Sequence, residues 1–119
     1  MHELSVCQAL IEQVDQVAKE NYAESVDQII VQIGPLSGIE SKLLLNAYGI
    51  ARMGTIAEDA MLEIEAMPIK IRCLQCNQQS EVLVNKLICP HCGDYKTQLI
   101  SGDEMILKTI GLVSVKEKH

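Results

Sequence analysis

The sequence predicts an α+β fold in which two helices pack on a small mixed sheet, with a cysteine-rich module inserted before the last strand. Three observations support this prediction. Apolar residues recur at helical spacing in two segments, three other segments are typical of strands, and four of the five cysteines lie between residues 69 and 101. At 119 residues, the chain is long enough for one domain and a small inserted module.

The first predicted helix begins near Leu4 and continues to Ala18. Its apolar residues recur every three or four positions, and polar residues lie between them: Leu4, Cys7, Leu10, Ile11, Val14, Val17 and Ala18. The next segment, 26–33, is rich in β-branched residues and stops at Gly34-Pro35. We therefore expect a strand with Ile29, Val31 and Ile33 on one face.

A second helix is predicted over residues 39–53. Ser37 and Glu40 have the spacing of a capping box, in which the serine would be the N-cap. The strand predicted over 61–66 alternates cleanly, with Leu62, Ile64 and Ala66 on one face, and Pro68 ends it. A strand, a helix and a strand in this order favour a parallel pair of strands joined by a right-handed crossover.

The composition changes between residues 69 and 101, where short strand-like pieces at 81–84 and 98–100 separate the cysteines. A last strand at 104–110 then returns the chain to the first domain. The expected domains are an α/β domain of residues 1–68 plus 102–119 and a module of residues 69–101.

The four cysteines of the module form two CxxC pairs, Cys73 with Cys76 and Cys89 with Cys92. Two such pairs can supply the four thiolates of a tetrahedral metal centre, and Gly93 permits the positive φ of a tight turn after the second pair. The donor set fits zinc or iron, of which zinc is the commoner structural ion, so the module is zinc-ribbon-like. A closed centre of this kind is structural rather than catalytic. Redox-active thiol pairs and disulfides are the alternatives, while Cys7 is expected in the core.

The first three residues allow two interpretations. Glu3 can simply open the first helix, where a carboxylate complements the helix dipole. Alternatively, the amine of Met1 and the backbone nitrogen and imidazole of His2 can form two fused chelate rings around Ni²⁺ or Cu²⁺. A nearby carboxylate would then favour the ion beside the positive end of the helix, and Glu3 and Glu40 are the candidates, although the sequence favours the capping role for Glu40.

The charge balance argues against nucleic-acid binding. The chain holds 16 acidic and 10 basic residues, a formal charge of -6, which repels phosphate backbones. No apolar run approaches the length of a membrane span, and the first residues do not resemble a secretion signal. We therefore expect a cytoplasmic protein, whose reducing surroundings favour metal ligation over disulfides.

Together, five segments make the sequence similar to the HypA/HybF family of hydrogenase maturation nickel metallochaperones. They are Met1-His2-Glu3-Leu4-Ser5, residues 33–40, residues 52–58, the two CxxC pairs, and Gly102-Asp103-Glu104-Met105-Ile106. The resemblance covers nearly the whole chain. The opening residues and the cysteine pairs are its most specific parts.

The resemblance implies a nickel carrier that is not an enzyme. It implies that His2 is the essential Ni²⁺ ligand, that the Met1 amine and backbone nitrogens near Glu3 complete that site, and that Cys73, Cys76, Cys89 and Cys92 hold Zn²⁺. The implied partners are a HypB-type GTPase and the large subunit of a nickel-iron hydrogenase, with urease maturation proteins as further candidates. The implied assembly is a monomer or a homodimer.

The alternative is a zinc-ribbon adaptor that binds nucleic acid or protein. Such an adaptor shares the four cysteines, but nucleic-acid binding needs a basic face and usually aromatic residues for stacking. This chain has no Trp, no Phe and only three Tyr. Nucleic acid is therefore not an expected partner.

Overall fold

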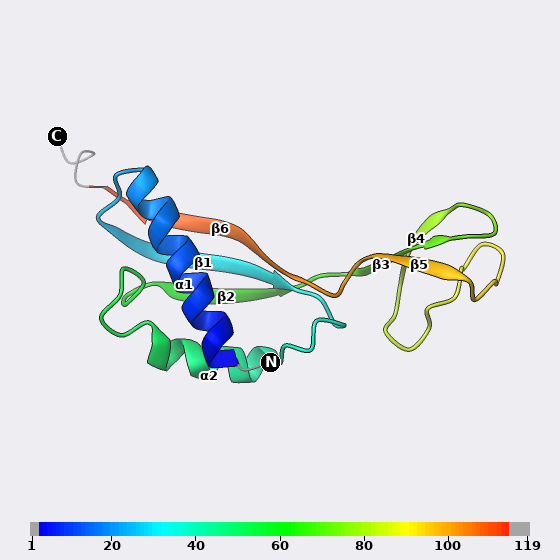
Figure 1. The fold of residues 1–119 in the computed structure, drawn as a ribbon, viewed down its shortest axis with the longest axis horizontal. Helices are drawn as coiled ribbons and strands as arrows, with labels where there is room; N and C mark the ends of the chain where they lie inside the picture. The colour runs from blue at the N-terminus through cyan, green and yellow to red at the C-terminus, as the bar shows by residue number, and fades with distance from the viewer. Residues whose placement is uncertain (1–2, 115–119) are drawn as a thin grey trace. The chain divides into compact units, whose positions relative to one another are not determined.

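The computed structural model describes residues 3–114 and confirms the predicted α+β fold. Figure 1 shows the arrangement of two helices and six strands along the chain. In chain order the elements are α1 (Glu3–Glu20), β1 (Ser25–Ile33), α2 (Ser41–Ala51), β2 (Met61–Ala66), β3 (Ile69–Cys73), β4 (Gln79–Val82), β5 (Thr97–Ser101) and β6 (Met105–Val113). Neither helix in this described part has both the length and the apolar character needed to cross a membrane.

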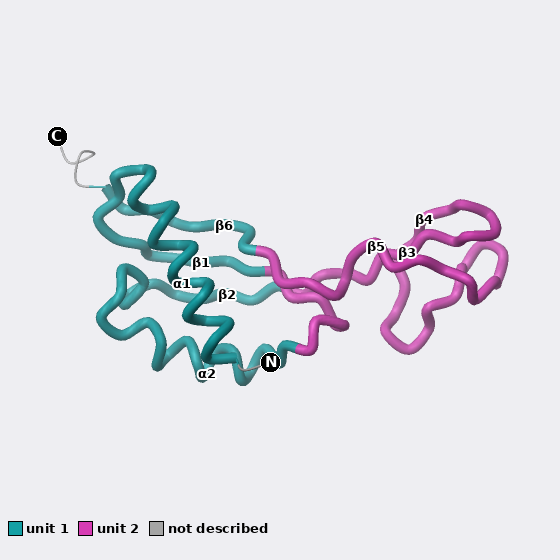
Figure 2. Tube along the Cα trace, in the orientation of Figure 1, with its two compact units in different colours: residues 1–31, 39–65, 107–119 teal, residues 32–38, 66–106 magenta. Residues whose placement is uncertain are grey.

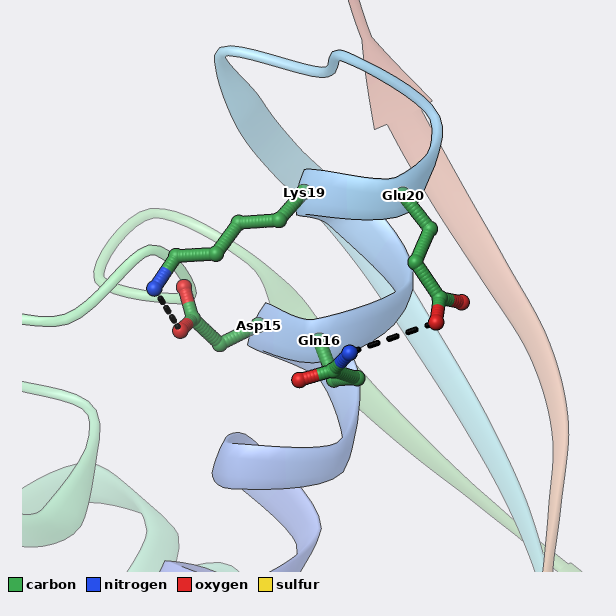
Figure 3. A network of polar contacts seen from close by, with 4 residues as sticks. All are labelled: Asp15, Gln16, Lys19 and Glu20. Atoms are coloured by element: carbon green, nitrogen blue, oxygen red, sulfur yellow. Dashed lines mark hydrogen bonds and ion pairs between the residues drawn. The ribbon is translucent and has the colours of Figure 1, made fainter.

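Helix α1 buries one apolar face, made of Cys7, Leu10, Ile11, Val14 and Ala18. Its polar face carries two contacts at the spacing of one helical turn (Figure 3). Lys19 Nζ lies 3.0 Å from Asp15 Oδ2, and Gln16 Nε2 donates to Glu20 Oε2 over 3.2 Å. The helix is therefore amphipathic, as its sequence predicts.

Helix α2 packs against α1 and is shorter than predicted. The Cys7 thiol donates to the Leu44 carbonyl oxygen at 3.4 Å, and Leu44 and Tyr48 are buried. The predicted capping box is wrong, because Glu40 itself is the N-cap, with extended backbone angles and no capping hydrogen bond from its side chain. The helix consequently begins at Ser41 rather than at residue 39.

The first sheet has the strand order β2-β1-β6. Figure 1 shows β1 and β2 running in the same direction and β6 in the opposite one, so the sheet is mixed as predicted. Ile29, Val31 and Ile33 are buried, which confirms the predicted inner face of β1. On the predicted face of β2, Leu62 and Ile64 are half-buried, whereas Ala66 at the end of the strand is exposed.

The alternation along β2 breaks next to an ion pair. Glu65 is half-buried, and its Oε1 accepts from Lys108 Nζ of β6 at 2.8 Å. This ion pair joins β2 to β6 and accounts for the partial burial of Glu65. The last residue of β2, Ala66, is exposed.

A second sheet, of order β4-β3-β5, belongs to the cysteine-rich segment. Strand β3 pairs antiparallel with both neighbours; Ile71 lies opposite Ser80 on one side and Leu99 on the other. The predicted strand pieces 81–84 and 98–100 lie within two residues of β4 and β5, but β3, the central strand of this sheet, was not predicted.

The chain divides into two compact units (Figure 2). Unit 1 comprises Met1–Val31, Ile39–Glu65 and Leu107–His119, and unit 2 comprises Gln32–Gly38 and Ala66–Ile106. Unit 2 contains a close backbone contact, in which Gly34 N–H donates to the Glu104 oxygen at 2.9 Å and Leu36 N–H to the Gly102 oxygen at 2.8 Å. A Cβ at Gly34 would overlap the Gly102 carbonyl, so this contact requires glycine.

Candidate metal centre

The two CxxC pairs come together in unit 2. The Sγ atoms of Cys73, Cys76, Cys89 and Cys92 all lie within 4.8 Å of one another. Cys73 Sγ is 3.5 Å from Cys92 Sγ, and Cys76 Sγ is 3.6 Å from Cys89 Sγ. Each short distance therefore joins one cysteine of the first pair to one of the second, which is the arrangement expected of a shared ion.

The first pair lies on a tight turn that follows β3. The Cys73 N–H donates to the Gln78 oxygen and the Asn77 N–H to the Cys73 oxygen, both at 2.9 Å. This turn places Asn77 at a positive φ of 65°. The Gln75 and Cys76 N–H groups donate to Cys73 Sγ at 3.3 and 3.4 Å, so backbone dipoles favour the thiolate form of Cys73.

The second pair forms the same turn, with two equivalent backbone hydrogen bonds. The Cys89 N–H donates to the Asp94 oxygen at 3.0 Å, and the Gly93 N–H donates to the Cys89 oxygen at 2.8 Å. Gly93 has a φ of 79°, which confirms the positive φ expected from the sequence. Asn77 occupies the equivalent position of the first turn, because asparagine tolerates this conformation better than most residues.

Backbone hydrogen bonds lower two of the four thiol pKa values. The N–H groups of Cys92 and His91 lower the pKa of Cys89 to about 6. The N–H groups of Cys76 and Gln75 likewise hold the pKa of Cys73 below its usual value. Both of these thiols are buried, so burial opposes the effect without reversing it.

The other two thiols hold their protons more firmly. The Gln78 N–H lowers the pKa of Cys76, but burial and the neighbouring thiols outweigh it and leave the pKa raised. The Asp94 N–H likewise lowers the pKa of Cys92, but the Cys73 thiol, burial and the remaining thiols outweigh it and raise that pKa to about 12. Four thiolates in so small a space repel one another, and only a cation would stabilise them all.

The arrangement fits a tetrahedral metal centre better than disulfides. Zinc–sulfur bonds of about 2.3 Å in a regular tetrahedron place the sulfur atoms about 3.8 Å apart. The observed distances of 3.5 and 3.6 Å are close to this value and far above the roughly 2.05 Å of a disulfide bond. All four thiols are free. The donor set is therefore suited to an ion with a preference for soft ligands, such as Zn²⁺.

Buried side chains in this part of the chain are almost restricted to the cluster. Among residues 72–106, the buried side chains are those of Cys73 and Cys89. The aliphatic residues of the loop that precedes the second pair are exposed instead, including Leu83 and Ile88. The thiol cluster thus takes the place that a hydrophobic core occupies in other small folds.

The predicted nickel ligands belong to a second candidate site, at the first three residues of the chain. Met1 and His2 fall outside the described residues, and Glu3 is the first residue of α1. Burial raises the pKa of the Cys7 thiol one turn further along, and the Glu3 carboxylate raises it too. Within residues 3–114, the four cysteines form the one group suited to holding a metal, and neither Glu3 nor Glu40 belongs to it.

Comparisons with known proteins identify relatives that all carry the same family name. A family model described as "Hydrogenase/urease nickel incorporation, metallochaperone, hypA" matches residues 1–112. The hydrogenase maturation factor HypA of Nitrosospira multiformis is 44% identical over 114 residues, covering 96% of this chain and 99% of that protein. HypA of Aquifex aeolicus is 43% identical over 112 residues, covering 94% and 97%.

The fold has relatives among solved structures as well. The solution structure of the Ni metallochaperone HypA from Helicobacter pylori superposes with a TM-score of 0.76 at 26% identity, covering 96% of this chain and 99% of that one. Because the family model and the similar sequences span almost the whole chain, this protein belongs to the HypA family of hydrogenase maturation nickel metallochaperones.

Proposed function

We propose that this chain binds Ni²⁺ at its N-terminus and delivers it to the large subunit of a nickel-iron hydrogenase during maturation. The match of residues 1–112 to a family of nickel incorporation proteins carries this proposal. In this view residues 1–68 with 102–119 form the nickel-binding domain, and residues 69–101 form the zinc-binding module.

Nitrogen donors at the start of the chain would hold the nickel. The Met1 amine, the His2 imidazole and backbone nitrogens from His2 to Glu3 can surround the ion in a plane, which is a geometry that Ni²⁺ favours. Glu3 begins α1, so its carboxylate can offset the positive end of the helix dipole beside a bound cation. A site at the end of a chain has few groups to rearrange, which suits an ion that must be released again.

Zinc would be the resident ion of the thiol cluster. Cys73, Cys76, Cys89 and Cys92 would provide all four ligands, so no coordination position would remain for a substrate. When bound, Zn²⁺ supplies the charge that keeps all four sulfurs deprotonated. The hydrogen bonds of the two backbone turns accompany the close approach of the four sulfurs.

The partners follow from the same role. We propose that the chain acts in the cytoplasm with a HypB-type GTPase, as a monomer or homodimer, and that urease maturation proteins are further partners. Supporting this, the matching family model names both hydrogenase and urease nickel incorporation.

The test compares His2→Ala with the unaltered protein. Equilibrium dialysis against Ni²⁺, followed by elemental analysis, should show that the variant loses tight nickel binding while its zinc content is unchanged. A His91→Ala variant is the matched control, because His91 lies in the second turn of the thiol cluster, and it should retain both metals. Undiminished nickel uptake by His2→Ala would refute the proposed site.

A further inference from the structure

Each short sulfur contact of the thiol cluster joins a buried cysteine to an exposed one. Cys73 and Cys89 are buried, whereas Cys76 and Cys92 are exposed. The 3.5 Å contact joins Cys73 Sγ to Cys92 Sγ, and the 3.6 Å contact joins Cys89 Sγ to Cys76 Sγ. A small molecule in solution can therefore reach one cysteine of each contact, while the second sulfur lies beside the first and is shielded.

The surroundings of the cluster leave it open to solvent. Leu74, between the two cysteines of the first pair, is 61% exposed, and Ile88, directly before the second pair, is 42% exposed. A cavity of about 390 Å³ borders the second pair and is lined by residues 81–83, Lys86 and residues 88–90. This space admits a molecule as small as hydrogen peroxide.

The cluster differs in this respect from the fifth cysteine of the chain. Peroxides oxidise the thiolate form of cysteine, and access decides which thiolates react. Ligation by a cation keeps a sulfur in the thiolate form. Cys7, by contrast, is fully buried in unit 1, where its thiol donates to the Leu44 oxygen at 3.4 Å. Oxidation should therefore begin at the cluster and spare Cys7.

From this geometry we propose that the cluster is a site of reversible oxidation by a peroxide, which closes a disulfide at each short sulfur contact and frees the resident ion. The products are the Cys73–Cys92 and Cys76–Cys89 disulfides. One loop lies inside the other in the sequence, so both bonds can close in the same chain. The inference rests on the proposed resident zinc and does not depend on nickel binding.

The reaction at each contact balances with one peroxide. The exposed thiolate attacks an oxygen of the peroxide, so the O–O bond breaks, a sulfenic acid forms and hydroxide leaves. The buried thiolate then attacks the sulfur of the sulfenic acid, so an S–S bond forms and a second hydroxide leaves. The two sulfurs lose two electrons, which the two peroxide oxygens accept.

The distances suit this second step. A disulfide bond is about 2.05 Å long, so the sulfurs at either contact need to approach by only about 1.5 Å. Once both bonds have closed, no thiolate of the cluster remains to hold the ion. A dithiol reductant returns the electrons and restores the four ligands.

The experiment treats the zinc-loaded full chain with about two equivalents of hydrogen peroxide. A chromogenic chelator should detect release of about one Zn²⁺ per chain, because each disulfide removes two ligands. Dithiothreitol with added Zn²⁺ should then restore the loaded protein. Cys7→Ser is the matched control and should release zinc to the same extent, since Cys7 does not belong to the cluster.

Peptide mapping by mass spectrometry identifies which sulfurs are joined. Trypsin cleaves after Arg72, Lys86 and Lys96, so each CxxC pair falls on a peptide of its own. Disulfides between the pairs should link these two peptides, and fragmentation of the linked product should join Cys73 to Cys92. Disulfides within the pairs would leave the peptides separate, each lighter by two hydrogens.

The possible failures are distinguishable. Zinc that stays bound while peroxide is consumed would overturn the inference, as would separate peptides that carry disulfides within each pair or sulfinic acids. Zinc missing from the untreated protein would refute the proposed resident ion, and this inference with it. Nickel dialysis of His2→Ala tests the proposed nickel site independently of all these results.

Discussion

At the scale of single residues, the four clustered thiols differ because they receive different hydrogen bonds. Cys89, with two backbone N–H donors, has a pKa of about 6, while the pKa of Cys92 is about 12 beside thiols that ionise first. In the folded cluster Cys92 and Cys76, whose pKa is also raised, therefore hold their protons most firmly. Metal binding must displace them.

We predict that zinc binding at pH 7 releases at least about two protons per ion, since Cys76 and Cys92 must ionise in the folded cluster and all four thiols must ionise if the metal-free segment is unfolded. The zinc affinity should fall as the pH is lowered, because protons then compete for all four sulfurs. Calorimetric titration in buffers of different ionisation enthalpy measures the number released. Release of less than one proton would show that the cluster is already ionised and contradict the assigned pKa order.

Single residues of the centre were predictable to different degrees. Gly93 was expected at positive φ because glycine is the usual residue in that conformation, and the two CxxC pairs had a spacing typical of a shared ion. Asn77 occupies the same position in the first turn. It could have been found by aligning the two CxxC pairs, but asparagine is also common in ordinary loops, so its signal is weak.

At the scale of elements, the buried Tyr48 side chain joins helix α2 to the segment that precedes β2. Tyr48 is buried, and its hydroxyl donates to the Ala60 oxygen at 2.8 Å and lies 3.3 Å from the Ala57 oxygen. Arg52 lies over the same ring, 5.8 Å from its centroid. Burial raises the pKa of Tyr48, so it remains a neutral donor throughout the physiological range.

We predict that Tyr48→Phe lowers the free energy of unfolding of unit 1 by about 1–3 kcal/mol, because buried carbonyl groups lose their donor. Tyr95→Phe is the matched control. Tyr95 is 75% exposed, and the same change there should leave stability within about 0.5 kcal/mol. Urea denaturation followed by circular dichroism measures both variants. Equal midpoints for the two would show that the Tyr48 hydroxyl contributes nothing to stability.

The elements with a clear period were predictable, whereas the start of α2 and strand β3 were not. The apolar spacing of α1 and the β-branched residues of β1 report a single buried face, which is why both elements were found. The N-terminus of α2 was misplaced because Ser37 and Glu40 match a capping box by spacing alone, while Glu40 itself has an extended backbone. Strand β3 is only five residues long and directly follows Pro68, so its short alternation carried little signal.

At the scale of the whole molecule, the two units are stabilised differently. Unit 1 has an aliphatic core from α1, α2 and β1 that includes Leu10, Ile29 and Leu44. Unit 2 buries Ile33, Met67, Ile69 and Ile71, and after them Cys73 and Cys89. The change in composition at residue 69 predicts a module of residues 69–101, which stays a prediction. Unit 2 also includes residues 32–38, in which Gly34 lies close to Gly102, and a contact of this kind leaves no signal in the composition.

We predict that metal removal unfolds the cysteine-rich segment and leaves the aliphatic core intact. The Cys73→Ala, Cys76→Ala double variant should lose its resident ion and the amide exchange protection of β4 and β5, because apolar burial there is too small to replace it. Protection in α1 and β1 should persist. Leu83→Ser serves as the control variant. Full protection of β4 and β5 in the metal-free double variant would exclude a structural role for the ion.

The central claim is that a transferable Ni²⁺ is bound by nitrogen atoms at the start of the chain, separately from the ion held by the four thiols. The most direct measurement adds a short extension ahead of Met1, which converts its amine into a peptide nitrogen, and determines both metals by dialysis and elemental analysis. We predict that the extended protein loses tight nickel binding and retains its zinc. Nickel binding equal to that of the unextended protein would contradict the account.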